Sequence, residues 1–345
     1  MAWYGSLARP LLFALPPEAA HRVAYRMLAL PLPWGRLGRA DRSPSLRCSL
    51  AGVELANPIG LAAGFDKTGE RVGALGRLGF GYVVAGTFTR HPRAGNPKPR
   101  IARDVRGASL VNAMGLPNPG AEVAAATLAR VPRVGPRIAS IADEEVLDVL
   151  ETHALLEPHV DAVELNASCP NVSWGRDRDN EAHLATLVHE LGARRSTPLG
   201  VKLPPFATPV EREVVLALAR IAVDAGADML TCANTRPVAA QTLSTGRGGL
   251  SGRALSDDTP EIVQSVIGAI DDAVPVTACG GIAAPRDAFA CLDAGAATLQ
   301  LYTGLIYRGP AILGELTSAI ASARGAEAEP GTGKNRRRDA ALPAP

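Results

Sequence analysis

The sequence has few aromatic residues and almost no net charge. Aromatic side chains make up 4% of the 345 residues, and the formal net charge is +2. A surface that binds single-stranded nucleic acid needs stacking rings and a strong positive field. A nucleic-acid role would rest on Arg336–Arg338 alone, which we interpret as a solvated run. The composition therefore predicts no nucleic-acid partner.

Paired cysteines are also lacking. The five cysteines are scattered along the chain without a C-x-x-C pair, at Cys48, Cys169, Cys232, Cys279 and Cys291. An odd, dispersed set of this kind is typical of a reducing compartment. It predicts neither a disulfide framework nor a structural zinc site, and we expect no metal.

Long apolar runs are absent. A transmembrane helix needs about 18 or more consecutive apolar residues, and no segment reaches that length. The N-terminus also lacks the charged, apolar and cleavage regions of a signal peptide. We therefore expect an intracellular protein without a membrane-spanning helix.

Short apolar runs and amphipathic stretches alternate from residue 55 onward. The eight strand-like runs are NPIGLAAGFD, FGYVVAGTFT, PRIASIAD, DAVELNASC, PLGVKLP, ADMLTCANT, VPVTACGG and AATLQLYTG. The helix-like stretches between them are Thr68–Leu78, Glu144–Leu155, Glu181–Arg194, Glu211–Ala225, Pro260–Ile270 and Pro285–Ala294. Eight strands, most followed by a helix, predict an α/β fold of the closed (β/α)8 TIM-barrel type. The alternative is an open doubly wound sheet, but no G-x-G-x-x-G follows the first strand.

The first 47 residues do not follow this alternation of strand-like and helix-like segments. They read as two short helices around a Pro-Pro turn, the second beginning at Pro17, with seven arginines against two acidic residues. This small N-terminal helical extension is either a cap packed on the main domain or a surface that enters an anionic membrane interface. We divide the chain into the extension (1–47), a barrel domain (48–324) and a disordered tail (325–345).

Polar residues gather where the predicted strands end, which is the edge at which barrel enzymes place their chemistry. They are mostly carboxamides, with two lysines, one thiol and several glycines. The most prominent are Lys67, Thr87, Ser140, Asn166, Cys169, Asn171, Lys202, Asn234, Thr235, Gly280, Gly281, Tyr302 and Thr303, with Asn112 and Asn118 in the loop after the second strand. Carboxamides suit a flat ligand with alternating C=O and N–H groups, and glycine turns suit a phosphate. This combination predicts a phosphorylated planar cofactor, such as flavin mononucleotide (FMN), beside a planar polar substrate.

Each of these residues could also have an ordinary structural role. An asparagine at a strand end is often a turn residue, a lone cysteine usually packs in a core, and a rim lysine is often solvated. The hypothesis of a site depends on their occurring together at one edge of one fold.

Six motifs, taken in order, resemble the dihydroorotate dehydrogenases, which are flavin enzymes of pyrimidine synthesis. The motifs are NPIGLAAGFDKTGE, GNPKPR, VNAMGLPNPG, LNASCPNV, GGLSGR and LYTGLIYRGP, and the similarity covers about residues 3–320. The resemblance implies a (β/α)8 barrel that binds FMN and oxidises dihydroorotate to orotate. A related flavin oxidoreductase of another dihydropyrimidine is the alternative.

The resemblance also implies roles for individual residues. Cys169 stands at the position of the catalytic base. The substrate-binding positions are Lys67, Asn112, Met114, Gly115, Leu116, Asn166, Asn171, Asn234 and Thr235. The cofactor-binding positions are Ala63, Gly64, Thr87, Ser140, Asn166, Lys202, Ala233, Gly252, Gly280, Gly281, Tyr302 and Thr303.

The family has two broad classes, and this sequence combines features of both. The N-terminal extension, with PPEAAHRVAYRML, resembles the membrane-associated class 2 enzymes, which pass electrons to a quinone. NASCPN, with its cysteine base, resembles the soluble class 1 enzymes, which use fumarate or NAD. Because the extension is a whole unit that serves the acceptor, we expect a quinone acceptor. We also expect peripheral attachment at the cytoplasmic side of the cell membrane, with a purely cytoplasmic protein as the alternative.

Overall fold

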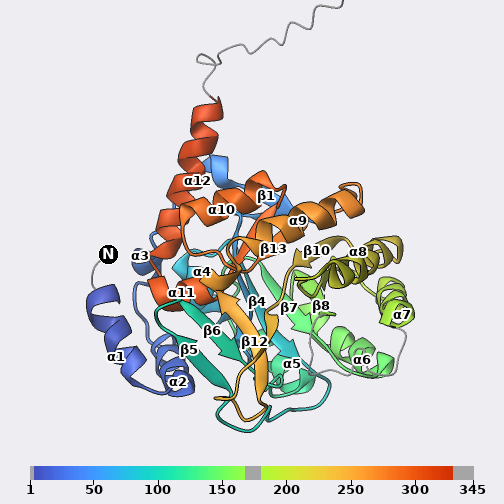
Figure 1. The fold of residues 1–345 in the computed structure, drawn as a ribbon, viewed down its shortest axis with the longest axis horizontal. Coiled ribbons are helices and arrows are strands. Elements are labelled where there is room, and N and C mark those ends of the chain that lie inside the picture. The colour runs from blue at the N-terminus through green and yellow to red at the C-terminus, as the bar shows by residue number, and fades with distance from the viewer. Residues whose placement is uncertain (1–3, 168–179, 329–345) are drawn as a thin grey trace, which may run out of the picture.

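The computed structural model describes residues 4–167 and 180–328. Its centre is a closed barrel of eight parallel strands in the order β10-β13-β14-β3-β4-β7-β8-β9 (Figure 1). The strands are β3 (Ile59–Asp66), β4 (Tyr82–Phe88), β7 (Arg137–Ile141), β8 (Ala162–Asn166), β9 (Leu199–Lys202), β10 (Met229–Cys232), β13 (Val276–Cys279) and β14 (Thr298–Leu301). The (β/α)8 prediction is therefore confirmed, and the open doubly wound alternative is wrong.

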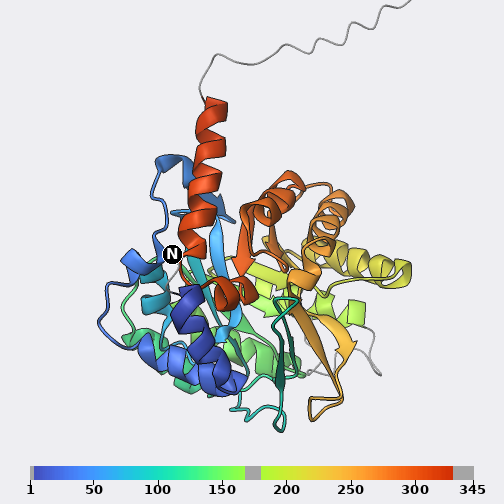
Figure 2. The same cartoon turned by 60° about the vertical axis from the view of Figure 1, so that its left-hand side comes forward.

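Helices surround the barrel, and each follows one of its strands along the chain (Figures 1 and 2). They are α4 (Val72–Leu78), α5 (Ala121–Arg130), α6 (Val146–Leu156), α7 (Asn180–Gly192), α8 (Pro209–Asp224), α9 (Asp258–Ala269), α10 (Pro285–Asp293), α11 (Thr303–Arg308) and α12 (Ile312–Ala328). The start of α8 shows how sequence sets a boundary. The hydroxyl of Thr208 accepts from the backbone N–H of Glu211, whose carboxylate accepts from the backbone N–H of Thr208, and Pro209 occupies the first turn.

The hydrophobic core lies between the barrel strands and this ring of helices. Apolar strand residues are fully buried there, among them Leu61, Val163 and Val201. They pack in one cluster with helix residues such as Leu128 of α5 and Leu187 of α7. The parallel strands are buried on both faces, which is why they read as continuous apolar runs in the sequence.

An antiparallel sheet lies outside the barrel and was not predicted. It has the order β11-β12-β6-β5, formed by β5 (Ile101–Asp104), β6 (Ser109–Asn112), β11 (Arg236–Ala239) and β12 (Arg247–Gly252). Strands β5 and β6 follow β4 along the chain, and β11 and β12 follow β10. Strand β12 pairs with β6 although the two are far apart in the sequence (Figure 1). Asn112 therefore lies on a strand and not in a loop. A second small hairpin joins β1 (Cys48–Leu50) and β2 (Val53–Leu55).

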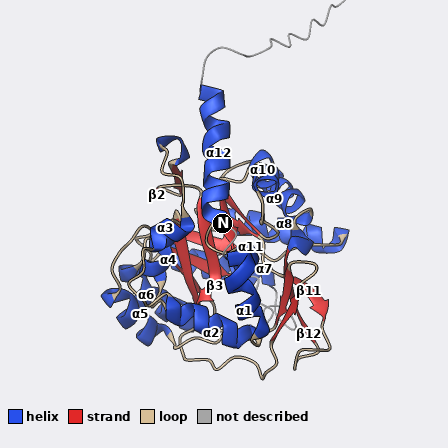
Figure 3. Cartoon of the chain, turned by 90° about the vertical axis from the view of Figure 1, so that its left-hand side faces the viewer, coloured by secondary structure: helices blue, strands red, loops and turns tan. Residues whose placement is uncertain are grey.

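The N-terminal extension forms the expected helical pair. It contains a π-helical turn, η1 (Tyr4–Ala8), followed by α1 (Arg9–Ala14), α2 (Pro17–Met27), α3 (Trp34–Gly38) and a 3-10 turn, η2 (Pro44–Leu46). Helices α1 and α2 lie beside the antiparallel sheet (Figure 3). Glu18 of α2 accepts two hydrogen bonds from the guanidinium of Arg100, and Arg103 donates to the carbonyl oxygens of Phe13 and Leu15.

The end of the extension is anchored in the protein body. Trp34 is buried in the main core. A Cβ atom at Gly38 would lie 1.7 Å from the carbonyl oxygen of Leu78, so only glycine permits this approach of α3 to α4. No helix in residues 4–167 or 180–328 is long and apolar enough to cross a membrane. Helix α12 continues to Ala328, so residues 325–328 are helical although the composition predicted a tail from residue 325.

Candidate active site

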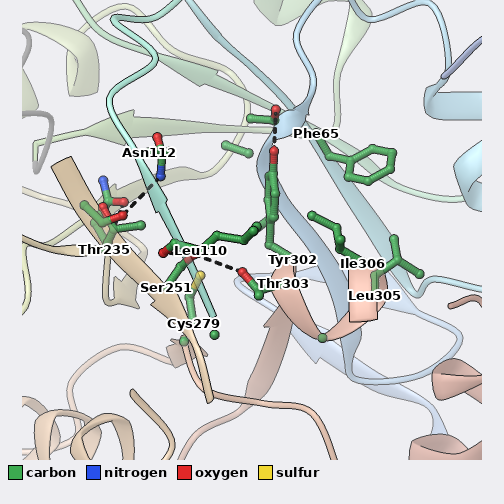
Figure 4. Close-up of a pocket in the computed structure, with 18 of the residues that line it drawn as sticks. Phe65, Leu110, Asn112, Thr235, Ser251, Cys279, Tyr302, Thr303, Leu305 and Ile306 are labelled. Atoms are coloured by element: carbon green, nitrogen blue, oxygen red, sulfur yellow. Dashed lines mark hydrogen bonds between the residues drawn. The ribbon is translucent and has the colours of Figure 1, made fainter. Parts of the chain in front are cut away.

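A cavity of about 1910 Å³ opens at the carboxyl ends of the barrel strands (Figure 4). Its walls include the barrel ends, the antiparallel sheet, and helices α1, α2 and α8. Pockets for one small ligand usually measure about 300–1,000 Å³. The space is therefore large enough for more than one flat molecule, and it extends from the barrel axis to the N-terminal extension.

Most of the predicted site residues line this one cavity. Those on its wall are Ala63, Gly64, Lys67, Thr87, Asn112, Met114, Gly115, Leu116, Asn166, Lys202, Ala233, Asn234, Thr235, Gly252, Gly280, Gly281, Tyr302 and Thr303. Ser140 lies behind the wall and contacts the hydroxyl of Thr87 at 3.0 Å. Cys169 and Asn171 lie outside the described residues. The described members of the predicted set are thus brought together in space.

The polar wall is formed by carboxamides and hydroxyls held in place by short contacts. Asn166 ends β8, and its Nδ2 donates to Oγ1 of Thr87 at 3.2 Å. In the antiparallel sheet, Asn112 of β6 donates to the carbonyl oxygen of Gly249 at 3.4 Å (Figure 4). The side chain of Asn234 accepts from the backbone N–H of Thr235 at 2.8 Å. These groups line one cavity and offer donors and acceptors to a flat heterocycle.

The loops after β12 and β13 approach each other at a second end of the cavity. Gly252 and Gly281 have φ values of +94° and +71°, which favour glycine. A Cβ at Gly281 would lie 2.4 Å from Cα of Ser256, so no larger residue fits this approach. Thr303 contacts the hydroxyl of Ser251 at 3.0 Å (Figure 4). Backbone amides of glycine turns, together with nearby hydroxyls, suit a phosphate group.

A buried cation stands at the barrel end of the cavity. Lys202 ends β9 and is 4% exposed, and its Nζ donates to Sγ of Cys279 at 3.6 Å. Burial acts against its charge, but Cys279 and Glu164 outweigh that effect and raise the pKa of Lys202. Lys202 is therefore protonated at neutral pH, and it is available to stabilise negative charge on a ligand in the cavity.

A line of rings joins the barrel to the N-terminal extension. His21 of α2 packs edge-on against Phe65, with ring centroids 5.3 Å apart, and Phe65 packs against Tyr302 at 5.8 Å. The hydroxyl of Tyr302 donates to the carbonyl oxygen of Gly64 at 3.1 Å (Figure 4). Burial, with Lys67 and Arg22 nearby, lowers the pKa of His21 to about 3, so its imidazole is neutral.

Lys67 lies between these two regions, and burial disfavours its charged form. Its Nζ donates to the carbonyl oxygen of Gly64. Burial lowers its pKa to about 8, although Asp66 partly offsets this. A lowered lysine pKa means that the folded protein disfavours the charged form.

Replacing Lys67 with methionine should therefore stabilise the ligand-free protein. We expect a gain of about 1–3 kcal/mol in the free energy of unfolding at pH 7, because a buried charge is removed while Tyr302 still donates to Gly64. The gain is full below pH 8, the folded pKa, and vanishes as the pH rises through 10.5, the unfolded value. Denaturant unfolding at pH 7 and at pH 10.5 measures it, and equal or lower stability of Lys67→Met at pH 7 would contradict the assignment.

The donor set fits a flavin. Lys202 supplies a cation, Asn166 and Thr87 supply polar groups, and the glycine loops supply a phosphate cradle. Gln300 lines the same cavity, and its amide oxygen is buried and has no hydrogen-bond partner. Such an unsatisfied acceptor is costly unless a ligand supplies a donor. Residues 4–167 and 180–328 contain no group of three or more His, Cys, Asp or Glu side chains suited to a metal ion.

Sequence reasoning missed several residues of the wall. Leu110, Ser251, Phe65 and Cys279 face the cavity (Figure 4). Leu110 and Ser251 belong to the antiparallel sheet, whose short strands carry no clear period. Cys279 directly precedes the Gly280-Gly281 turn, and that position was the only available signal.

Known proteins with a similar sequence and fold share one description. The family model described as dihydroorotate dehydrogenase matches residues 45–323. A protein of Roseiflexus sp. (strain RS-1) named dihydroorotate dehydrogenase (quinone) is 36% identical over 338 residues, covering 92% of this chain and 93% of the relative. A protein of the same name from Rhodospirillum rubrum is 37% identical over 335 residues, covering 92% and 90%.

Two solved structures of a DHODH have a fold similar to that of this chain. The ligand-free DHODH of Eimeria tenella superposes with a TM-score of 0.78 at 28% identity, covering 90% of this chain and 96% of that one. The same enzyme in complex with ferulenol gives a TM-score of 0.76 at 26% identity, with 90% and 93% covered.

Proposed function

The chain belongs to the dihydroorotate dehydrogenase family, in its quinone-linked class, and we propose which of its residues bind the cofactor, the substrate and the quinone. The enzyme oxidises dihydroorotate to orotate in pyrimidine biosynthesis and transfers the electrons to a quinone. The observation that carries the proposal is the single cavity, which joins the polar barrel end to the apolar space beneath α1 and α2. One end suits substrate and cofactor, and the other suits an apolar acceptor.

FMN would be held by the barrel end. Gly252, Gly281 and Thr303 would bind its phosphate, while Thr87, Asn166 and Lys202 would bind its ring. When bound, the flavin supplies the acceptor for the hydride that leaves the substrate. Lys202 contributes a fixed, protonated amine that favours negative charge at the ring.

Dihydroorotate would bind between the ring and the antiparallel sheet. Asn112, Asn166, Asn234 and Thr235 offer the amide and hydroxyl groups that match its ring edges, and Lys67 offers a cation for its carboxylate. The proton must leave from the carbon next to the one that loses hydride. We assign that step to Cys169, whose thiolate would accept it. Asn171 would complete the polar set around the substrate.

The quinone would approach under the N-terminal helices. Ala20, Val23 and Met27 of α2 line that part of the cavity, and none of them carries a polar side chain. Neutral His21 and the rings of Phe65 and Tyr302 lead from there toward the flavin site. Residues 1–47 would form the acceptor-access unit and residues 48–324 the FMN domain; of the predicted tail, residues 329–345 lie outside the described residues.

Anaerobic titration of the purified protein tests this function. Dihydroorotate should bleach the flavin absorbance, and dihydrouracil should not. The reduced protein is then mixed with a soluble quinone, with fumarate and with NAD⁺. Rapid reoxidation by the quinone alone is expected, and rapid reoxidation by fumarate alone would contradict the assigned acceptor.

Peripheral attachment to the cytoplasmic face of the membrane would bring this entrance to the quinone pool. Large apolar side chains are exposed on the N-terminal extension, among them Leu7 (61% exposed) and Leu30 (49% exposed). Seven arginines in residues 1–47 would favour anionic headgroups.

The double variant Leu7→Ser/Leu30→Ser should bind anionic phospholipid vesicles at least tenfold more weakly. Burying one leucine side chain in lipid contributes about 1.5–3 kcal/mol, and two are lost. Vesicle co-sedimentation measures the change. Val210→Ser is the matched control, because Val210 is an exposed apolar residue of α8 away from the extension, and it should bind as the wild type does. Equal binding by all three proteins would argue against attachment through the extension.

A further inference from the structure

The barrel interior beneath the flavin site contains a polar cluster where branched apolar residues are usual. The hydroxyl of Tyr82 contacts that of Thr298 at 3.0 Å, and Thr298 contacts Thr277 at 2.7 Å. Gln300 of β14 and Glu164 of β8 continue the cluster toward the cavity. The side chains come from four barrel strands, β4, β8, β13 and β14, and are all buried.

Glu164 is the acidic member of this cluster. Its Oε2 accepts from Oγ1 of Thr231 at 2.9 Å and from Nε2 of Gln300 at 3.4 Å. Its Oε1 is buried and has no hydrogen-bond partner, and the residue is 2% exposed. Two hydrogen bonds from neutral groups do not compensate for the removal of a carboxylate from water, so a cation is required nearby.

Lys202 is that cation. Strands β8 and β9 are neighbours, with Asn166 opposite Lys202 and Glu164 opposite Gly200. Cys279 contacts Lys202, and burial raises the pKa of its thiol. Within residues 4–167 and 180–328, Glu164 is the carboxylate that acts on Lys202. Glu164 and Asn166 are two residues apart on β8 and share one face, so Glu164 lies one register step from Lys202 on the adjacent strand.

We propose that Glu164 is a positioning residue which, as the counter-ion of Lys202, sets the reduction potential of the bound flavin. The proposal rests on the proposed function, because it needs FMN beside Lys202. A lone protonated lysine would favour the reduced, more negative flavin. A carboxylate behind it opposes that field, so Glu164 shifts the equilibrium toward the oxidised form. The flavin then releases electrons to an acceptor more readily than it would beside Lys202 alone.

Glu164→Gln tests the proposal, since it removes the charge and keeps the shape. The two-electron reduction of bound FMN should become about tenfold more favourable, which corresponds to a potential about 30 mV more positive. Anaerobic spectroelectrochemistry with reference dyes measures the potential without turnover. Glu164→Met, which is neutral and similar in size, should show the same sign of change. Thr298→Val is the control, because it alters the same cluster without removing a charge, and it should shift the equilibrium less than twofold.

The outcomes separate this proposal from the function on which it rests. A wild-type protein that binds no FMN, or is not bleached by dihydroorotate, contradicts the proposed function. A wild-type protein that does both, with an unchanged potential in Glu164→Gln, overturns only the counter-ion role. Folded Glu164 variants that no longer bind FMN also overturn it, because removal of a charge that opposes the lysine should not weaken binding of the oxidised cofactor.

Discussion

Cys169→Ala should retain its FMN but be bleached by dihydroorotate about 10²–10⁴-fold more slowly than the wild type. This is the usual contribution of a positioned general base. Cys169 follows β8 by three residues, and Asn166 at the end of that strand lines the cavity. Anaerobic stopped-flow measurement of the flavin absorbance isolates this step from reoxidation.

The pH dependence of the bleaching rate distinguishes a thiol base from a purely structural role of Cys169. A free thiol is only a few per cent thiolate at pH 7, so the wild-type rate should rise with pH through the neutral range. Cys169→Ser should keep partial activity with a shifted profile, because the two groups differ in pKa. Cys48→Ala is the matched control, since Cys48 lies on the β1–β2 hairpin and should leave the rate unchanged. An unchanged rate in Cys169→Ala would remove the thiol from the mechanism.

The barrel could be predicted because its signal is repeated eight times. Each strand is buried on both faces and reads as an apolar run, as in Tyr82–Phe88, where every residue is buried. The strand ends could be predicted as a site for the same reason, since parallel strands bring Thr87, Asn166 and Lys202 to one edge. For the barrel and for the site, the local sequence pattern and the topology indicate the same structure.

The antiparallel sheet could not be predicted, because its stability comes from partners distant in sequence. Gly249 of β12 pairs with Asn112 of β6, 137 residues away. The strands are short, and β12 contains the run Arg247-Gly248-Gly249, which has no alternating pattern. Glu164 was missed for a related reason. In the sequence it stands inside an apolar run, and only the closed barrel shows that it faces Thr231 and Gln300.

Ala24→Trp should slow reoxidation of the reduced enzyme by a quinone about 10–100-fold. Ala24 lies on α2 and lines the part of the cavity beneath the N-terminal helices. An indole at this position would occupy the space next to His21 and Phe65, through which we expect the quinone to approach. Displacement of a reactant by about 1 Å can cost a factor of about 10² in rate. Reduction of the flavin by dihydroorotate should stay at the wild-type rate, because we propose that the substrate binds at the other end.

This split between the two half-reactions is the informative result. Double-mixing stopped-flow measures both in one experiment, first with dihydroorotate and then with a soluble quinone. Ala29→Trp is the matched control, since Ala29 is an exposed residue just beyond α2 and does not line the cavity, and it should affect neither half. Equal slowing of both halves in Ala24→Trp would indicate a general distortion of the barrel mouth. Unimpaired quinone reoxidation would mean that the acceptor reaches the flavin by another route, and the extension would then serve only as a cap.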